Sequence, residues 1–269
     1  MKRFFLAALL SCGATQAAHA AADAALQAAI GGDWRGANAS RDGARHPYET
    51  LRFFGIAPGM TVVELAPGGG WYTEILAPYL RGQGQLIAAG NDPQSADEGT
   101  RRGAARFAEK LAAKPTVFDR VRPGVFEPQR DDYRYAAKGS ADMVLTFRNI
   151  HNWIPLGPER LKTLFAGVYD SLKPGGVFGV VEHRLPAARA QDATASSGYL
   201  HEAYVIALAE GAGFRLAGRA EINANPRDTA EHPNGVWALP PTYANKDAGR
   251  AGYAAIGESD RMTLKFVKP

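Results

Sequence analysis

The chain has 269 residues, of which 46% are hydrophobic and 22% are charged, and it contains a single cysteine. This balance is ordinary for a globular protein and excludes a wholly disordered chain. No run of about 18 apolar residues is present, so the sequence predicts no ordinary transmembrane helix. The formal net charge is only +4, and the Lys and Arg residues form no cluster interleaved with aromatic residues. We therefore expect no nucleic-acid partner.

The first 20 residues have the pattern of a secretory signal peptide. Lys2 and Arg3 precede a short apolar run over residues 4–10, and an A-x-A sequence ends at Ala20. Cleavage after Ala20 would give a periplasmic or secreted protein that lacks Cys12, the only cysteine, and therefore has no disulfide. Two alternatives stay open: a lipoprotein cleaved at Cys12, and a first helix of the folded domain.

Apolar, β-rich runs alternate with helical patterns along the rest of the chain. We expect helices over residues 23–30, 48–54, 71–80, 98–113, 158–172 and 197–212, the third ending near Pro78, with a loop over 35–47 and a turn over 173–176. We expect strands over residues 61–66, 85–89, 117–126, 142–147, 177–182, 214–222 and 261–267. Strand segments such as residues 61–63 and 143–145 lack polar alternation, as in sheets covered by helices on both faces. The sequence therefore predicts an α/β fold with a doubly wound parallel sheet over residues 58–269, preceded by a helical cap segment over 21–57.

A glycine-rich turn follows the first predicted strand and opens directly into a helix. It runs E-L-A-P-G-G-G from Glu64 to Gly70, and such turns let backbone N–H groups approach a ligand closely. A P-loop is excluded because Lys is missing, and a dinucleotide fingerprint is disfavoured because Thr73 stands where its last glycine should be. The acidic Glu64 at the strand end fits an S-adenosylmethionine site, although a turn without a ligand stays open. Of the next two residues, Trp71 is expected in the core and Tyr72 in the pocket.

The sequence resembles the class I S-adenosylmethionine-dependent methyltransferases in three places. VELAPGGG over residues 63–70 is similar to the family's first motif, with Ala66 where glycine is commoner. DMVLTFRNIH over 142–151 is similar to its fourth-strand motif, and LKPGGVF over 172–178 to the turn into its fifth strand. Shorter stretches within 41–47, 70–73 and 149–153 resemble an exported subgroup of predicted methyltransferases.

The resemblance implies a seven-stranded Rossmann-like sheet in the order 3-2-1-4-5-7-6, with the seventh strand antiparallel. It implies S-adenosylmethionine as the cofactor and places these residues beside it: Glu64, Ala66, Pro67, Gly68, Gly70, Tyr72, Asn91, Asp92, Glu127, Phe147 and Asn149. Gly90 departs from the family pattern, in which an acidic residue usually holds the ribose. We expect Asn91 or Asp92 to reach the ribose instead, and Glu127 to lie near the adenine.

Two histidines are expected at the edge of the sheet where the parallel strands end. His151 follows the fourth predicted strand and is the candidate catalytic residue, as a base or an acceptor-orienting group; His183 closes the fifth. A purely structural His151 stays open. The six histidines show no H-E-x-x-H or other short ligand spacing, so no metal site is expected. His46 and the segment 225–242 are expected to fold over this edge as a substrate cap, and a purely structural loop stays open as the alternative.

These observations favour an S-adenosylmethionine-dependent methyltransferase that acts on a small molecule. The alternative is a non-catalytic exported binding module with the same fold, which the missing acid at Gly90 favours. The sequence names no acceptor and no oligomeric state.

Overall fold

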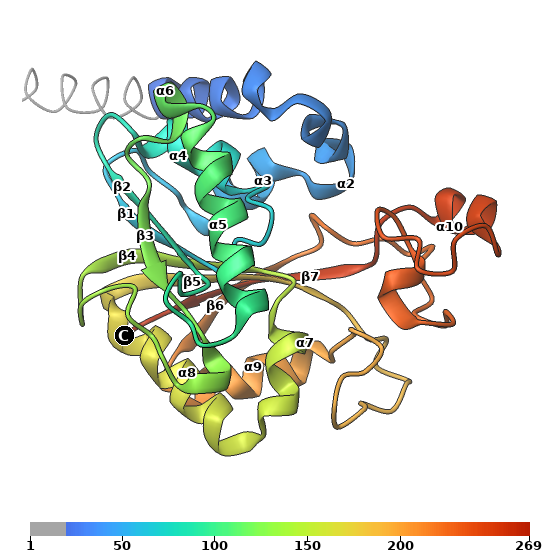
Figure 1. The fold of residues 1–269 in the computed structure, drawn as a ribbon. Helices are drawn as coiled ribbons and strands as arrows, with labels where there is room; N and C mark the ends of the chain where they lie inside the picture. The colour runs from blue at the N-terminus through green and yellow to red at the C-terminus, as the bar shows by residue number, and fades with distance from the viewer. Residues whose placement is uncertain (1–19) are drawn as a thin grey trace, which may run out of the picture.

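The computed structural model describes residues 20–269 (Figure 1). The signal-peptide prediction therefore falls almost wholly outside the described residues. Residues 20–30 form a helix that ends at Gly31, as expected from the Gly-Gly pair that follows it. No helix among the described residues combines the length and the hydrophobicity needed to cross a membrane.

The centre of the molecule is a seven-stranded mixed sheet in the order β3-β2-β1-β4-β5-β7-β6. All neighbouring strands are parallel except β7, which runs antiparallel to both β5 and β6. The predicted strand order and the antiparallel seventh strand are confirmed. The strands are β1 (Thr61–Leu65), β2 (Gln85–Gly90), β3 (Arg122–Val125), β4 (Ala141–Phe147), β5 (Leu172–His183), β6 (Arg215–Ala220) and β7 (Arg261–Val267).

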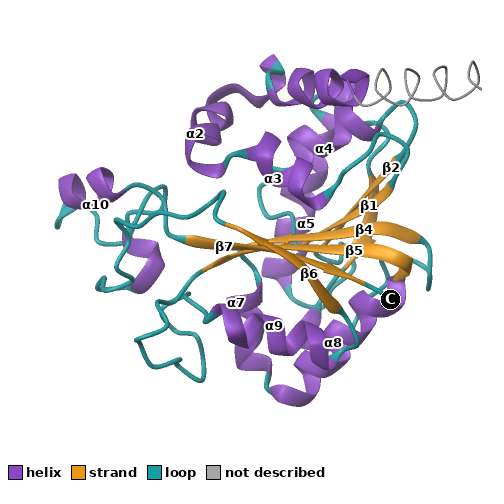
Figure 2. Cartoon of the chain, turned by 180° about the vertical axis from the view of Figure 1, so that it is seen from behind, coloured by secondary structure: helices purple, strands orange, loops and turns teal. Residues whose placement is uncertain are grey.

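Helices cover both faces of the sheet, as Figure 2 shows in a view close to edge-on. One layer contains α3 (Pro47–Phe54), α4 (Thr73–Leu80), α5 (Glu98–Ala112) and α6 (Pro115–Phe118), and the other contains α7 (Ile150–Trp153), α8 (Pro158–Ser171) and α9 (Glu202–Gly211). The remaining helical segments are α2 (Asp42–Arg45), α10 (Arg250–Ile256) and the 3-10 segments η1 (Asp33–Arg41), η2 (Pro128–Arg130), η3 (Ile154–Leu156) and η4 (Gly235–Ala238).

The consecutive apolar residues of the central strands are explained by two separate cores, one on each face. Val62 and Val63 are both fully buried, yet Val62 packs in the core under α3 and α4 while Val63 packs in the core under α8 and α9. Successive side chains of a strand point to opposite faces. A strand between two helical layers therefore needs apolar residues at consecutive positions, and each buried Val contributes roughly 1.5–3 kcal/mol.

The segment 35–47, predicted as a loop, is helical, which corrects that prediction. It contains most of η1, α2 and the first residue of α3. Arg35 is buried and donates two hydrogen bonds of 2.6 Å to Asp42, one to each carboxylate oxygen. Its guanidinium also lies over the ring of Trp71, 4.8 Å from the centroid. These tertiary contacts fix polar residues whose local pattern does not predict a helix.

Helix α4 ends at Leu80, the last residue of the predicted range, but it begins at Thr73 rather than at residue 71 and is not interrupted near Pro78. Proline lacks the N–H that would donate to the carbonyl four residues earlier, which here belongs to Glu74. The indole Nε1–H of Trp34 donates to that carbonyl instead, at 2.8 Å. A side chain from η1 therefore replaces the hydrogen bond that the proline removes, and the helix does not end.

Three other predicted boundaries move. The first part of the predicted strand 117–126 is the end of α6, and β3 covers only Arg122–Val125. The predicted turn 173–176 lies within β5 as a bulge, between the pairs Ala141–Leu172 and Met143–Val177. Helix α9 begins at Glu202 rather than at residue 197, because the N–H of Leu200 bonds to the carbonyl of His183.

Candidate functional site

The glycine-rich turn after β1 is open to solvent and lines a cavity. Ala66, Gly68 and Gly70 have positive φ angles of 48°, 57° and 74°, and a Cβ placed on Gly68 or Gly69 would meet nothing within 4 Å. Ala66, Pro67, Gly68 and Gly69 form one wall of a cavity of about 260 Å³, here called the turn cavity. Phe147 and Asn149, at the end of β4, form part of another wall.

A second cavity of about 450 Å³, the Glu127 cavity, shares Ala66 and Asn149 with the turn cavity. Asn91 and Glu127 lie on its wall. The Glu127 carboxylate accepts the backbone N–H of Asp92 at 2.9 Å. The Asn149 amide donates to the carbonyl of Leu65 at 3.1 Å, which ties the ends of β1 and β4 together. The two cavities therefore follow the carboxyl ends of neighbouring parallel strands, where ligands bind in sheets of this kind.

A third cavity of about 280 Å³, the histidine cavity, contains His151 and His183 in its wall. Both residues are buried, with 5% and 9% exposure. Val236, Trp237 and residues 240–242 close the opposite side. The predicted cap segment 225–242 therefore reaches the predicted edge of the sheet, and the ring of Trp237 lies 5.9 Å from that of His151.

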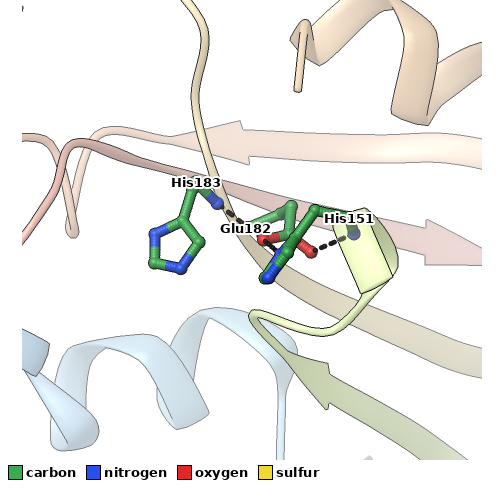
Figure 3. Close-up of side chains that lie close together, drawn as sticks. All are labelled: His151, Glu182 and His183. Atoms are coloured by element: carbon green, nitrogen blue, oxygen red, sulfur yellow. Dashed lines mark hydrogen bonds and ion pairs between the residues drawn. The ribbon is translucent and has the colours of Figure 1, made fainter. Parts of the chain in front are cut away.

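His151 is held by a buried carboxylate from the neighbouring strand (Figure 3). Its Nδ1 lies 2.9 Å from Oε1 of Glu182, which is fully buried at the end of β5. The other carboxylate oxygen, Oε2, accepts the N–H of Ile150 at 2.6 Å and that of His151 at 3.3 Å, while Oε1 also accepts the N–H of His183 at 2.9 Å. A carboxylate can only accept hydrogen bonds, so Nδ1 of His151 must carry the ring proton that it donates to Glu182. In the neutral ring Nε2 is then free to accept a proton.

His183 is neutral and oriented by a different partner. Its Nδ1 lies 2.6 Å from Oγ of Ser259, and its ring centroid lies 5.2 Å from that of His151. Burial lowers the pKa of His183 well below its usual value, and repulsion from His151 and Arg148 acts in the same direction. The site therefore presents two imidazoles to one cavity, with His183 uncharged at neutral pH.

Four arginines surround the cavities, and sequence reasoning gave none of them a role. Arg41, Arg45 and Arg148 line both the turn cavity and the histidine cavity, and Arg261 lies beside them. Burial lowers the pKa of Arg45 to about 9 and that of Arg148 to about 10, so both stay charged at pH 7. Glu258 forms ion pairs with Arg41, Arg45 and Arg261. Burial opposes the ionisation of its carboxyl, but Arg45 and Arg261 hold the pKa of that carboxyl below the usual range.

The structure brings most of the predicted cofactor residues to these cavities. Ala66, Pro67, Gly68, Phe147 and Asn149 line the turn cavity, and Asn91 and Glu127 line the Glu127 cavity. The side chain of Asp92 is paired with Arg134 at 2.7 Å, and it is not among the residues that line the cavity. The wall of the Glu127 cavity also carries Asp97. Sequence reasoning did not single out this residue as a replacement for the acid that usually holds the ribose.

Three predicted residues lie behind the cavity walls. Glu64 is buried and accepts the hydroxyl of Thr73 at 2.6 Å, and burial raises the pKa of its carboxyl to about 8. Gly70 faces the side chains of α5 rather than the cavity. Tyr72 is buried against Phe147, with ring centroids 3.5 Å apart and planes 8° apart. Trp71 lies in the core, as expected, and also lines the turn cavity, whereas Tyr72 lies in the same core and is not among the residues that line the cavities.

His46 is absent from the cavity walls, which corrects its expected place in the cap. It is the left-handed residue between α2 and α3, with φ of 41°. Arg41 and Arg45 of the same segment reach the cavities instead.

The structure also places three possible metal ligands together, which short sequence spacing did not reveal. Ligand atoms of His151, Glu182 and His183 lie within 4.8 Å of one another. The Glu182 oxygens are already occupied by N–H donors, and the charged Arg45 and Arg148 line the two cavities at this end of the sheet. This geometry fits an imidazole oriented by a carboxylate better than a cation site.

Comparison with known proteins gives similarity at the level of structure. No family model and no curated protein matches the chain. A S-adenosylmethionine-dependent methyltransferase from Aquifex aeolicus matches 86% of this chain and 93% of its own, with a TM-score of 0.56 and 15% identity. A geranyl diphosphate C-methyltransferase from Streptomyces coelicolor, solved with S-adenosyl-L-homocysteine, matches 86% and 80%, with a TM-score of 0.55 and 15% identity.

The [4+2]-cyclase SpnF also matches, over 84% of this chain and 80% of its own, with a TM-score of 0.54 and 15% identity. Identities this low establish the fold alone, and one fold hosts several chemistries. The chain therefore has the Rossmann-like fold of class I S-adenosylmethionine-dependent methyltransferases, with strand order 3-2-1-4-5-7-6 and an antiparallel seventh strand.

Proposed function

We propose that the protein is an S-adenosylmethionine-dependent methyltransferase that acts on a small molecule. The observation that carries the proposal is the continuity of the site. The open turn at Gly68 and Gly69 lines a cavity that shares Asn149 with the Glu127 cavity and Arg148 with the histidine cavity. A cofactor pocket and an acceptor pocket therefore meet at the end of β4, as the transfer of a group between two bound molecules requires.

The residues present fit the cofactor. A Cβ at Gly68 or Gly69 would fill the space over the turn, whereas glycine leaves it open for a ligand close to the backbone. Asn91, Asp97 and Glu127 offer polar atoms in the Glu127 cavity for an adenosine group. When bound, S-adenosylmethionine supplies an activated methyl group, so the protein mainly has to align the acceptor with it.

His151 is the proposed base. Glu182 fixes its ring and keeps the proton on Nδ1, so Nε2 can accept a proton from an acceptor O–H or N–H. His183, neutral and held by Ser259, forms the neighbouring wall and orients the acceptor. Glu182 acts through His151 and is a positioning residue.

The second candidate, a non-catalytic binding module, is favoured by Gly90, which offers no side chain where an acid usually holds the ribose. The similar solved structure of SpnF, a [4+2]-cyclase, is an example of a protein on this fold that is not named as a methyltransferase. Calorimetric titration with S-adenosylmethionine, S-adenosylhomocysteine and NAD separates these functions. We expect both sulfur compounds to bind and NAD not to bind; no binding of either at millimolar concentration would refute the methyltransferase.

The catalytic role of His151 is tested with a substitution and a matched control. His151→Ala should reduce methyl transfer by about 10²–10⁴-fold, the usual contribution of general-base catalysis, and leave S-adenosylhomocysteine affinity unchanged. His201→Ala replaces a histidine at the start of α9 that does not line the cavities, and it should leave both quantities unchanged. Equal turnover in the two variants would remove His151 from the mechanism.

We also propose that the first 20 residues direct export and are cleaved after Ala20, which places the enzyme in the exported subgroup. The basic start, apolar run and A-x-A end support this. Mass spectrometry of the protein from a secreting host should give an N-terminus at Ala21. A lipid-modified N-terminus at Cys12 would support the lipoprotein alternative, and an intact Met1 would contradict export by either route.

A further inference from the structure

The histidine cavity has an excess of buried positive charge that the proposed reaction does not explain. Arg41, Arg45 and Arg261 share one carboxylate, Glu258, through N–O contacts of 2.7, 3.1 and 3.0 Å. Arg148 lies half-buried in the wall of the same cavity, and its guanidinium has no hydrogen-bond or ion-pair partner among residues 20–269. Four guanidinium groups therefore face one carboxylate, and counting the nearby Glu182 still leaves an excess of positive charge.

Some of the buried N–H donors of these arginines have no acceptor. Nη1 of Arg45 and Nη2 of Arg41 are buried without a hydrogen-bond partner among the described residues. Arg45 is only 3% exposed, and its guanidinium is stacked on the ring of Trp71, 4.7 Å from the centroid. A buried cation with unfilled donors is costly unless an anion completes it. Guanidinium groups are the side chains best suited to bind carboxylate or phosphate oxygens.

The cofactor cannot balance this charge. S-adenosylmethionine carries a sulfonium, an ammonium and one carboxylate, so its net charge is positive and adds to the excess. Its single carboxylate could occupy one guanidinium fork, whereas Arg41, Arg45 and Arg148 all line the histidine cavity as well. An anion on the acceptor side would both fill the free donors and offset the sulfonium charge.

We propose that the histidine cavity binds the methyl acceptor as a small organic oxyanion, held by Arg148, Arg45 and Arg41. This inference rests on the proposed function and names its substrate class. Val236, Trp237 and the two prolines at 240 and 241 give the opposite wall an apolar character, so the acceptor has an apolar body attached to its acidic group. A volume of about 280 Å³ lies near the lower end of small-ligand pockets, which favours a small acid over an acidic polymer.

The test is calorimetric titration of the purified protein, with and without saturating S-adenosylhomocysteine. The probes are benzoate and phenyl phosphate, with benzamide as the neutral match of benzoate. We expect at least one anion to bind with a Kd below about 10 mM, and benzamide to bind at least about tenfold more weakly than benzoate. This comparison on the unaltered protein does not depend on the folding of any variant.

Two variants locate the binding site. Arg148→Met should weaken the bound anion by about tenfold or more and S-adenosylhomocysteine by less than about threefold. Arg102→Met, which replaces an arginine that is 62% exposed on α5, should change neither. Thermal unfolding of both variants establishes that they are folded. Arg41→Met replaces a partly exposed member of the cluster, and it should have the same effect on the anion if Arg148→Met does not fold.

The competing source of an anion is the carboxylate of the cofactor itself. 5′-Methylthioadenosine has the adenosine and sulfur of the cofactor but no carboxylate. Comparing its binding with that of S-adenosylhomocysteine therefore shows whether the arginines bind the cofactor carboxylate or an acceptor anion. If Arg148→Met weakens S-adenosylhomocysteine about tenfold and leaves 5′-methylthioadenosine unchanged, the arginines serve the cofactor and the proposal is overturned. Failure of both anions to bind, or equal binding of benzamide and benzoate, would also overturn it. Anion binding without S-adenosylhomocysteine binding would contradict the methyltransferase proposal and support the anion site alone.

Discussion

Glu64 shows how the structure changes the meaning of a sequence motif. In the sequence it is the acid at the start of the glycine-rich motif, but in the fold it is 2% exposed and bonds to Thr73. Burial raises the pKa of its carboxyl from the ordinary 4.5 to about 8. Between these values the folded protein binds more protons than the unfolded chain, so stability falls as the pH rises from about 4.5 to about 8.

The size of the effect follows from that shift. At pH 7 the solution is about 2.5 units above the unfolded pKa, and each unit corresponds to about 1.4 kcal/mol, so protonating this carboxyl on folding costs about 3 kcal/mol. Glu64→Gln keeps an oxygen for Thr73 and removes the charge. We expect the variant to be more stable than the natural protein by about 2–3 kcal/mol at pH 8, and to differ little at pH 5.

Thermal unfolding at pH 5 and pH 8 measures this difference. The expected gain at pH 8 corresponds to a rise in Tm of roughly 5–10 °C for a chain of this size. Glu98→Gln, on an exposed pair of α5, is the control and should show no such trend. The reasoning is refuted if the advantage of Glu64→Gln does not grow from pH 5 to pH 8. A tenfold loss of S-adenosylhomocysteine affinity would show that Glu64 contacts the cofactor after all.

Three further predictions address the site. Glu182→Gln should lower kcat by at least about tenfold without changing the cofactor affinity, because the Gln amide has one acceptor oxygen where Glu182 has two, so Nδ1 of His151 and the N–H of Ile150 can no longer both donate to it; an unchanged kcat would contradict this. Gly68→Val should weaken the binding of S-adenosylhomocysteine by about tenfold or more in calorimetry, because φ of Gly68 is 57° and a side chain there would fill the cavity. Gly82→Ala is the control and should leave this binding unchanged, because Gly82 lies in open space and its φ is not positive. Below pH 6.5 the His183→Gln variant should lose less stability than the natural protein. The pKa of the natural imidazole is lowered in the fold, so in acid this side chain takes up a proton on unfolding, which favours the unfolded chain. Equal losses of stability in acid unfolding curves would exclude that role.

The fold could be predicted from the sequence because the alternation of apolar strand-like runs with helical segments is local and is repeated along the chain. Runs such as residues 143–145 are apolar at consecutive positions, as is typical of a strand covered by helices on both faces. The glycine-rich turn, the motif after β4 and the two histidines all follow the carboxyl ends of strands. Sequence order alone therefore places them at one edge of the sheet, and the structure has them lining adjoining cavities there.

The helical segment before the sheet was not predictable in this way, because its stability comes from partners far along the chain. Trp34 replaces the hydrogen bond that Pro78 removes, and Arg35 is held by both Asp42 and Trp71. Neither contact leaves a periodic pattern in the sequence. The same segment delivers Arg41 to the cavities, where its partner Glu258 lies 217 residues away.

The strand succession, the open turn and the position of His151 could all be predicted from the amino-acid sequence, since each depends on residues adjacent in the chain. Three features became visible only in the folded chain: Glu182 orients His151, Glu64 and Tyr72 lie behind the cavity wall, and four arginines surround one carboxylate. Charge balance in a buried cavity depends on which side chains meet in space. These contacts depend on how distant segments pack against one another, so they cannot be predicted from a local motif.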